Sequence, residues 1–177
     1  MSETLAPEKV DLKDAEKGSG NRTLLVVFKL GGEEYGLPID QIKEVVLTPR
    51  ISKIPQTPSY VKGVANIRGN VISIIDLEER FGLNGQNGTS SNGESLEPNS
   101  NYTLVIESEE FKIGVLVKDV PNTLSITDSE IDSSSGLLKH SALDENAING
   151  IVKAGDRMII MIDILSMMNA GDIAVSN

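Results

Sequence analysis

Short runs of β-branched and other apolar residues alternate with polar turns along most of the chain. The runs at residues 23–30 and 33–39 flank Gly31-Gly32, a pattern that predicts a β-hairpin. Further strands are predicted around residues 42–46, 60–65, 71–75, 102–106, 113–117, 148–152 and 157–162. Helical turns are expected only at 78–81, 142–146 and 163–168. The pattern therefore predicts a protein of the all-β class, built mainly from strands with a few short helices.

Three segments lack the apolar period that a packed element requires. Residues 1–22 and 169–177 are predicted to be tails on either side of one folded region, 23–168. Within that region, residues 84–101 consist mostly of Gly, Asn, Ser and Pro, and we expect them to form a mobile insertion. The insertion separates the folded region into two halves.

The two halves resemble each other. Gly63 precedes Asp76 by 76 − 63 = 13 residues, and Gly150 precedes Asp163 by 163 − 150 = 13 residues, with a turn glycine and a strand between them in both halves. A single unit of about 60–70 residues buries little apolar surface, so two packed units are the more stable arrangement. Chance similarity between strand–turn–strand sequences is the alternative explanation.

Composition narrows the possible partners. The formal net charge is −10, which opposes binding to nucleic acid or to an anionic membrane surface. The chain has no cysteine, and no apolar run approaches the roughly 20 residues of a membrane helix. The polar N-terminal segment does not resemble a secretory signal. These features predict a cytoplasmic protein without direct membrane insertion.

The sequence contains no evident cluster of catalytic or metal-ligating side chains. The single histidine, His140, has no second imidazole or thiolate at ligand spacing, and is expected to be an ordinary surface or partly buried residue. Gly31-Gly32 lacks the lysine and serine of a phosphate-binding loop, and no Gly-x-Ser-x-Gly motif is present. The acidic pairs Glu33-Glu34, Glu78-Glu79 and Glu109-Glu110 are expected to be solvated turn charges. We therefore expect no enzymatic activity, metal or cofactor.

The segment Asn66-Ile67-Arg68-Gly69 predicts an ordered turn between two strands, because Asn and Gly tolerate positive φ. Arginine is enriched in protein interfaces, where its guanidinium offers five donors in a rigid plane. Arg68 is therefore a candidate for partner binding. An ion pair with a nearby carboxylate such as Asp76 is the structural alternative, and the sequence leaves both open.

Several motifs together resemble the CheW-like domains of bacterial chemotaxis. In the first half they are Phe28 to Gly36, Ile42 to Val45, Ile54-Pro55, Pro58 to Val64, Asn66 to Gly69 and Ile74 to Leu77. The second half adds Ile113 to Val117, Val120, Leu124 and Gly155 to Ile159. The resemblance covers about residues 23–168, and the run from Pro58 to Leu77 is its most specific part. The long 84–101 insertion and the extended N-terminal tail depart from the family pattern.

The resemblance implies a fold, a site and partners. The family fold is two SH3-like, five-stranded β-barrels packed on a shared hydrophobic core. Ile42, Glu44 and Val45 match the family's kinase-binding positions, and Gly63, Asn66 and Arg68 match its receptor-binding positions. The implied partners are the regulatory domain of the histidine kinase CheA and the signalling tip of a methyl-accepting chemotaxis receptor. The implied location is the cytoplasm, with recruitment to receptor arrays at the inner membrane.

The function implied by the resemblance is that of a non-enzymatic adaptor, which supports receptor control of kinase activity. An adaptor of the same kind in a non-chemotactic two-component pathway is the alternative. A small hydrolase on a β-barrel is a third hypothesis, from a different class. That hypothesis requires a clustered nucleophile and base, which the sequence does not show.

Overall fold

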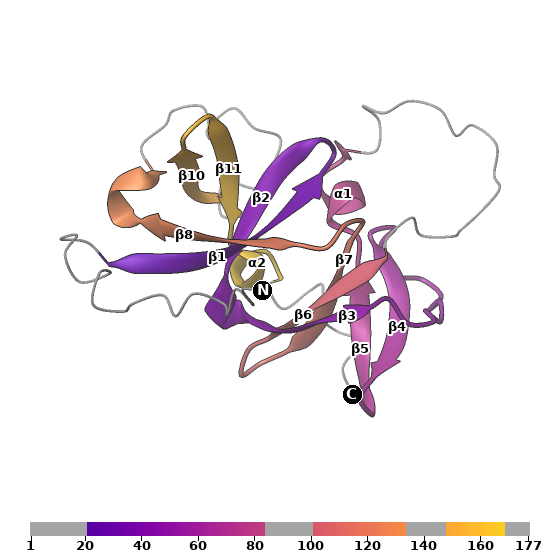
Figure 1. Ribbon diagram of the computed structural model, residues 1–177. Coiled ribbons are helices and arrows are strands. Elements are labelled where there is room, and N and C mark those ends of the chain that lie inside the picture. The colour runs from indigo at the N-terminus through magenta and orange to yellow at the C-terminus, as the bar shows by residue number, and fades with distance from the viewer. Residues whose placement is uncertain (1–20, 84–100, 134–147, 169–177) are drawn as a thin grey trace, which may run out of the picture.

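The computed structural model describes residues 21–83, 101–133 and 148–168, which form two packed β-sheets with a few short helices (Figure 1). The first half contains β1 (Arg22–Leu30), β2 (Glu33–Pro38), η2 (Ile39–Gln41), β3 (Ile42–Leu47), β4 (Val61–Ile67), β5 (Asn70–Ile75) and α1 (Leu77–Arg80). The second contains β6 (Tyr102–Glu107), β7 (Lys112–Val117), β8 (Asn122–Thr127), η4 (Asp128–Glu130), β9 (Ile131–Asp132), β10 (Ile148–Ala154), β11 (Arg157–Ile162) and α2 (Ile164–Met167). No helix within these ranges has the length and apolarity to cross a membrane.

Each sheet takes strands from both halves of the chain. One sheet, which we call barrel A, has the order β8-β1-β2-β11-β10-β9, and the other, barrel B, has the order β3-β6-β7-β5-β4. Two parallel pairings join the halves, β2 with β11 and β5 with β7. In Figure 1 the indigo β1 and β2 lie between the orange β8 and the yellow-brown β11. The halves are thus interleaved, and neither half forms a barrel by itself.

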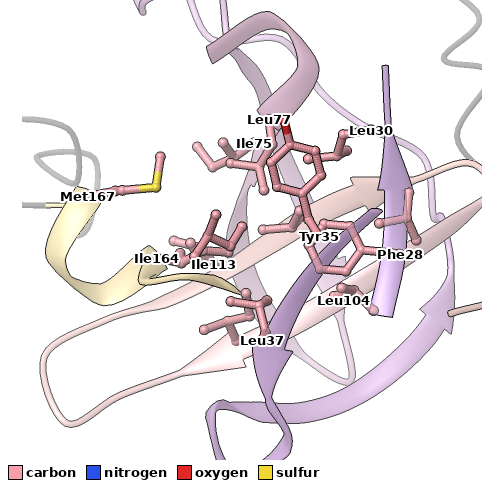
Figure 2. Close-up of a cluster of buried hydrophobic side chains, with 14 of the residues drawn as sticks. Phe28, Leu30, Tyr35, Leu37, Ile75, Leu77, Leu104, Ile113, Ile164 and Met167 are labelled. Atoms are coloured by element: carbon pink, nitrogen blue, oxygen red, sulfur yellow. The ribbon is translucent and has the colours of Figure 1, made fainter. Parts of the chain in front are cut away.

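Apolar side chains divide the interior into three clusters. The largest lies between the barrels and joins β1 and β2 of barrel A to β5, β6 and β7 of barrel B, with α1 and α2 at its margin (Figure 2). A smaller cluster fills each barrel, with Leu25 and Val27 in barrel A and Ile72 and Ile74 in barrel B. Because successive side chains of a strand point to opposite faces, β1 contributes Leu25 and Val27 to one cluster and Phe28 to the other. This arrangement explains the uninterrupted apolar run at its centre.

The predicted internal repeat is present in the structure. The strand pairing has an irregularity between Val61 and Gly63 in β4, and a matching one between Ile148 and Gly150 in β10. Thirteen residues after each glycine, an aspartate side chain caps a short helix: Asp76 accepts from the Glu79 N–H and Asp163 from the Ser166 N–H. The same backbone device thus closes the equivalent corner of both barrels.

The predicted strands are all present, with small changes at their ends. β4 continues through Ile67, so the turn predicted over Asn66 to Asn70 is reduced to Arg68 and Gly69. Residues 48–60 contain no helix, as their three prolines predict. The predicted N-terminal tail, 1–22, extends too far, because Arg22 is the first residue of β1. Its residues 1–20, the C-terminal tail, the 84–101 insertion except its last residue, and the helical turn at 142–146 lie outside the described residues.

Candidate functional site

The β4–β5 turn presents Arg68 in a strained backbone conformation. Arg68 and Gly69 are the two residues between the strands, with φ values of 52° and 84°. Positive φ at both positions is what a tight two-residue hairpin turn requires. The Asn66 side-chain oxygen accepts a hydrogen bond from the Gly69 N–H at 2.9 Å and so fixes the turn. A left-handed conformation costs a residue with a side chain about 1–2 kcal/mol, so Arg68 is held there at the expense of stability.

The structure confirms the alternative that Arg68 pairs with a carboxylate, but the partner is Glu44 and not Asp76. Arg68 Nε lies 2.6 Å from Glu44 Oε2, with side-chain exposures of 73% and 20%. Asp76 instead caps α1, and burial raises the pKa of its carboxyl group above the usual range. The Arg68–Glu44 pair connects β3 with the β4–β5 turn, that is, the two edges of the barrel B sheet. It therefore brings a predicted kinase-binding residue against a predicted receptor-binding residue.

The three predicted kinase-binding residues lie on one strand but not on one face. In β3, Ile42 pairs with Ile106 and Val45 pairs with Leu104, and both partners belong to the core between the barrels. Ile42 and Val45 are three residues apart, which would place them on opposite faces of a regular strand. The irregularity between Ile42 and Glu44 brings them to the same face. Glu44 points to the other face, where it reaches Arg68.

An apolar surface continues along β3 beyond the predicted residues. Val45 is 42% exposed, and Leu47, two residues further on the same face, is 73% exposed. The alternation of exposed and half-buried residues along this strand leaves both side chains in water. Leu47 was not among the predicted site residues. The sequence could have indicated Leu47, because it lies two residues after Val45, and residues two apart in a strand have their side chains on the same face.

Gly63, a predicted receptor-binding residue, has a structural role in the fold. It is buried, with a φ of 141°, and a Cβ atom there would lie 2.1 Å from the carbonyl oxygen of Ser52. Ser52 and Val64 exchange two backbone hydrogen bonds, each 2.8 Å long, so the 48–60 segment is fixed against β4 at this point. Only glycine permits this approach. Gly63 therefore positions the segment between β3 and β4.

The internal repeat supplies a second copy of every candidate position except Ile42. The strand-pairing registers match between the barrels, and they relate the copies residue by residue. The second copy has Asn122 in place of Glu44, Thr123 in place of Val45, Ser125 in place of Leu47, Lys153 in place of Asn66, and Gly155 in place of Arg68. Gly63 is matched by Gly150.

The differences between the copies fall on exposed groups. At the position of the strained Arg68, the second copy has Gly155 at a φ of 63°. Gly155 and Asn122, which match Arg68 and Glu44, are uncharged, so the second copy lacks this ion pair. A barrel of this kind therefore folds without the pair. Polar residues also replace the exposed Val45 and Leu47. We interpret these features of barrel B as retained for recognition, because strain and exposed apolar surface are kept where function requires them.

The acidic pairs are not simply solvated charges, and that prediction is corrected for three of the residues. Glu34 accepts two hydrogen bonds from Arg157, at 2.8 and 3.0 Å, and the guanidinium lowers the pKa of its carboxyl group. Glu78 pairs with Lys118 at 3.3 Å and Glu79 pairs with Lys62. Adjacent positions in sequence gave no indication of these partners, which come from other strands.

His140 lies outside the described residues. Within residues 21–83, 101–133 and 148–168, no group of three or more His, Asp or Glu side chains is placed to hold a metal ion.

Known proteins resemble this chain over most of its length. The family model for the CheW-like domain matches residues 24–172. The chain is 30% identical to the chemotaxis protein CheW of Helicobacter pylori over 157 residues, 86% of this chain and 88% of that one. It is 29% identical to the chemotaxis protein CheW of Klebsiella aerogenes over 150 residues, 85% and 84% of the two chains.

A solved structure supports the same assignment. The crystal structure of the scaffolding protein TtCheW from Thermoanaerobacter tengcongensis superposes with a TM-score of 0.68 and 32% sequence identity, covering 86% of this chain and 91% of that chain. The family model, the two relatives and the solved structure each match most of this chain. The chain therefore belongs to the CheW-like domain family.

Proposed function

We propose that this protein is a chemotaxis adaptor that holds the regulatory domain of the histidine kinase CheA and the signalling tip of a chemoreceptor in a fixed relative position. It has no chemistry of its own in this role. A conformational change in the receptor alters kinase activity because the adaptor contacts the two receptor states differently. The protein acts in the cytoplasm, at receptor arrays of the inner membrane.

One observation carries the proposal: the Arg68–Glu44 ion pair joins the two edges of barrel B beside an exposed apolar strand. Val45 and Leu47 supply apolar surface, and Arg68 supplies a charged group with most of its surface in water. Interfaces combine these elements, with apolar or arginine anchors surrounded by polar groups. The second barrel lacks both features at the matching positions, so they are not requirements of the fold.

The family relatives support the chemotactic pathway. The relatives described above that match most of the chain are chemotaxis proteins by name. The alternative of a non-chemotactic pathway gains no support from them. Moderate affinity at each surface is sufficient, because many copies act together in an array.

The binding test exchanges the recognition residues for those of the second copy. The full chain, Val45→Thr/Leu47→Ser and Arg68→Gly are each tested for binding to a CheA regulatory domain and to a receptor signalling tip. Each of these substitutions introduces a residue that the other barrel already carries. We expect the β3 variant to weaken kinase-domain binding most and the Arg68 variant to weaken receptor binding most. The Arg68 variant should also weaken kinase-domain binding to a smaller extent, because Glu44 loses its partner. Val71→Thr, which changes another exposed apolar residue of barrel B, is the matched control.

The results separate the parts of the proposal. If the unchanged chain binds neither partner, the adaptor function is wrong. If the chain binds both and the variants do so equally well, the function stands and the site assignment fails. Kinase activity measured with receptor present completes the test, because an adaptor is required for the receptor to alter that activity.

A further inference from the structure

The six predicted site residues all lie in barrel B, which leaves barrel A without an assigned surface. Within residues 21–83, 101–133 and 148–168, barrel A ends on one side with β8, whose one paired neighbour is β1 (Figure 1). A strand at the edge of a sheet presents unpaired N–H and C=O groups, to which another extended chain can add. We therefore considered which groups β8 presents and what they select.

The register of the β1–β2 hairpin determines which backbone N–H and C=O groups of β8 point away from β1. Leu30 and Glu33 close the two-residue turn between β1 and β2, so alternate residues of β1, counted from Leu30, bond to β2. The residues between them bond to β8, which directs the backbone groups of Thr123 and Ser125 away from β1. The Thr127 N–H, on the same outward side, donates to Glu130 Oε2 at 2.7 Å. Because Glu130 is not part of β1, this contact agrees with an N–H of Thr127 that points away from β1.

β8 lacks the devices that usually protect an edge strand. Its six residues, Asn122 to Thr127, include no charged residue and no proline, and its pairing with β1 runs without irregularity. The edge strand of barrel B is different, since β3 has an irregular register and carries Lys43 and Glu44. Charges and irregularities of this kind discourage unwanted pairing. The two edges of the repeat have therefore diverged, and β8 has kept a regular, open backbone.

The surroundings of β8 define the chemistry of an added strand. Asp119 precedes the strand and Asp128 follows it; both are exposed, and in the described part of the chain neither is in an ion pair. These carboxylates favour basic groups at both ends of an incoming segment. Ser125 pairs with the exposed Leu24. Because the serine side chain is small, a long apolar side chain opposite it can reach across to Leu24.

We propose that β8 is a strand-addition site, which binds an extended segment of a partner protein with basic residues at its ends and an apolar residue at its centre. Main-chain hydrogen bonds to Thr123 and Ser125 supply the affinity. The flanking aspartates and Leu24 supply the selectivity. Such a site allows barrel A to bind a second partner while barrel B keeps its own, which suits an adaptor but does not depend on the function proposed for barrel B.

The test uses a synthetic peptide of seven residues with blocked ends, lysine at each terminus and alternating threonine and valine around a central leucine. It is titrated into the full-length, ¹⁵N-labelled chain, and the exchange rates of the Thr123 and Ser125 amide protons are measured by NMR. We expect both to slow by about tenfold at saturation, as new backbone hydrogen bonds form. A peptide with glutamate at each terminus should bind more weakly, and added salt should reduce this difference.

Two proline variants make the test specific. Ser125→Pro removes an N–H that points away from β1, so the sheet is retained while strand addition is blocked. Leu47→Pro makes the same change at the matching position of β3 and should leave peptide binding unaltered. Unchanged exchange rates in the amides of β1 confirm that both variants fold.

Three results would overturn the proposal. The first is no slowing at Thr123 and Ser125 at millimolar peptide. The second is equal binding by the Ser125→Pro variant. The third is protection of both amides without peptide, together with a molecular mass that rises with concentration, which would make a second copy of this chain the occupant of β8.

Discussion

Arg68 Nε and Glu44 Oε2 lie 2.6 Å apart, so a residue predicted to bind receptor and a residue predicted to bind kinase form one ion pair. The two sites are therefore adjacent on barrel B and share a charged contact. Removal of either side chain frees the other, and a substitution at one site is expected to alter binding at both. Single alanine variants alone cannot assign one partner to each residue. A double-mutant cycle is required.

Substitution of Arg68 by glycine should separate stability from binding. The change relieves a strained conformation worth about 1 kcal/mol and removes an exposed ion pair worth about 0.2–1 kcal/mol. We therefore expect the free energy of unfolding, measured in urea, to remain close to that of the unchanged chain. Arg68→Ala keeps the strain and should be slightly less stable. Receptor binding at the level of the unchanged chain in both variants would show that Arg68 makes no contact.

Substitution of Gly63 by alanine should be strongly destabilising. Its Cβ would lie 2.1 Å from the Ser52 carbonyl oxygen, and relief requires the 48–60 segment to move away from β4. We expect a loss of about 3 kcal/mol, which is typical for a forced backbone clash. Gly69→Ala is the matched control, because it also has positive φ but open space around its Cβ position. That variant should lose only about 1 kcal/mol. Equal losses would mean that the contact with Ser52 is easily relaxed.

The capping aspartate of α1 carries a charge that burial disfavours. Burial raises the pKa of Asp76 above its ordinary value of 3.8, so the folded chain holds this proton more tightly than the unfolded chain. The contribution of Asp76 to stability is thus greatest at low pH and falls as the pH rises from about 3.8 through the raised value. Asp76→Asn keeps a cap without the charge, so its stability relative to the unchanged chain should increase over this pH window.

Chemical unfolding at several pH values checks the Asp76 prediction. Asp76→Ala removes the acceptor of the Glu79 N–H as well as the charge, and should lose about 1 kcal/mol relative to the asparagine variant. A constant difference between Asp76→Asn and the unchanged chain from acid to neutral pH would contradict the raised pKa.

Glu78 holds the two barrels together at one margin of their shared core. Its carboxylate accepts a hydrogen bond from the Gly31 N–H at 3.1 Å in the β1–β2 turn, and pairs with Lys118 at the end of β7. We expect Glu78→Ala to destabilise the chain by about 1–2 kcal/mol, since a charge-assisted hydrogen bond is lost. Exchange of the Gly31 amide proton should also accelerate. Glu110→Ala, which changes an exposed residue of the β6–β7 turn, should have neither effect.

The interleaved strand order predicts that two fragments of the chain assemble with each other. Cleavage between residues 92 and 93 would leave β2 and β11, and β5 and β7, on different fragments. Neither fragment can complete a barrel alone, so each should lack stable β structure by circular dichroism. Co-expressed fragments should copurify through a tag on one of them. Independent folding of either fragment would contradict this account.

Local patterns in the sequence were sufficient to predict nine of the strands, because strand formation depends on β-branched runs and on turns such as Gly31-Gly32. The strands β8 and β9 were missed, because their polar and short segments show no such run. The repeat was visible for a similar reason, since Gly63 and Gly150 each stand 13 residues before a capping aspartate. The pairing between halves was not predictable in this way. Nothing near Tyr35 in the sequence indicates that Ile160 of β11 becomes its neighbour in a parallel ladder.

The site was only partly predictable for the same physical reason. The turn was predicted because Asn66 and Gly69 are typical turn residues, and Arg68 became a candidate because arginine is enriched in interfaces. The partner of Arg68 was missed because Glu44 lies 24 residues away and meets it only when the edges of barrel B close on each other. Leu47 was missed because its exposure depends on the absence of a neighbouring strand. The need for glycine at position 63 was also not visible in the sequence, because it depends on the approach of Ser52.

The parallel pairing of β2 with β11 has a consequence for synthesis in the cell. The β1–β2 hairpin leaves the ribosome early, while Arg157, the partner of Glu34, is 123 residues further along the chain. At ordinary rates of translation this distance corresponds to a delay on the order of 10 s. During that time the edge of β2 that β11 later covers has no strand beside it, although β8, which pairs with β1, is made earlier. Until β11 has been added, the backbone groups along this edge of β2 are therefore open to pairing with other extended chains.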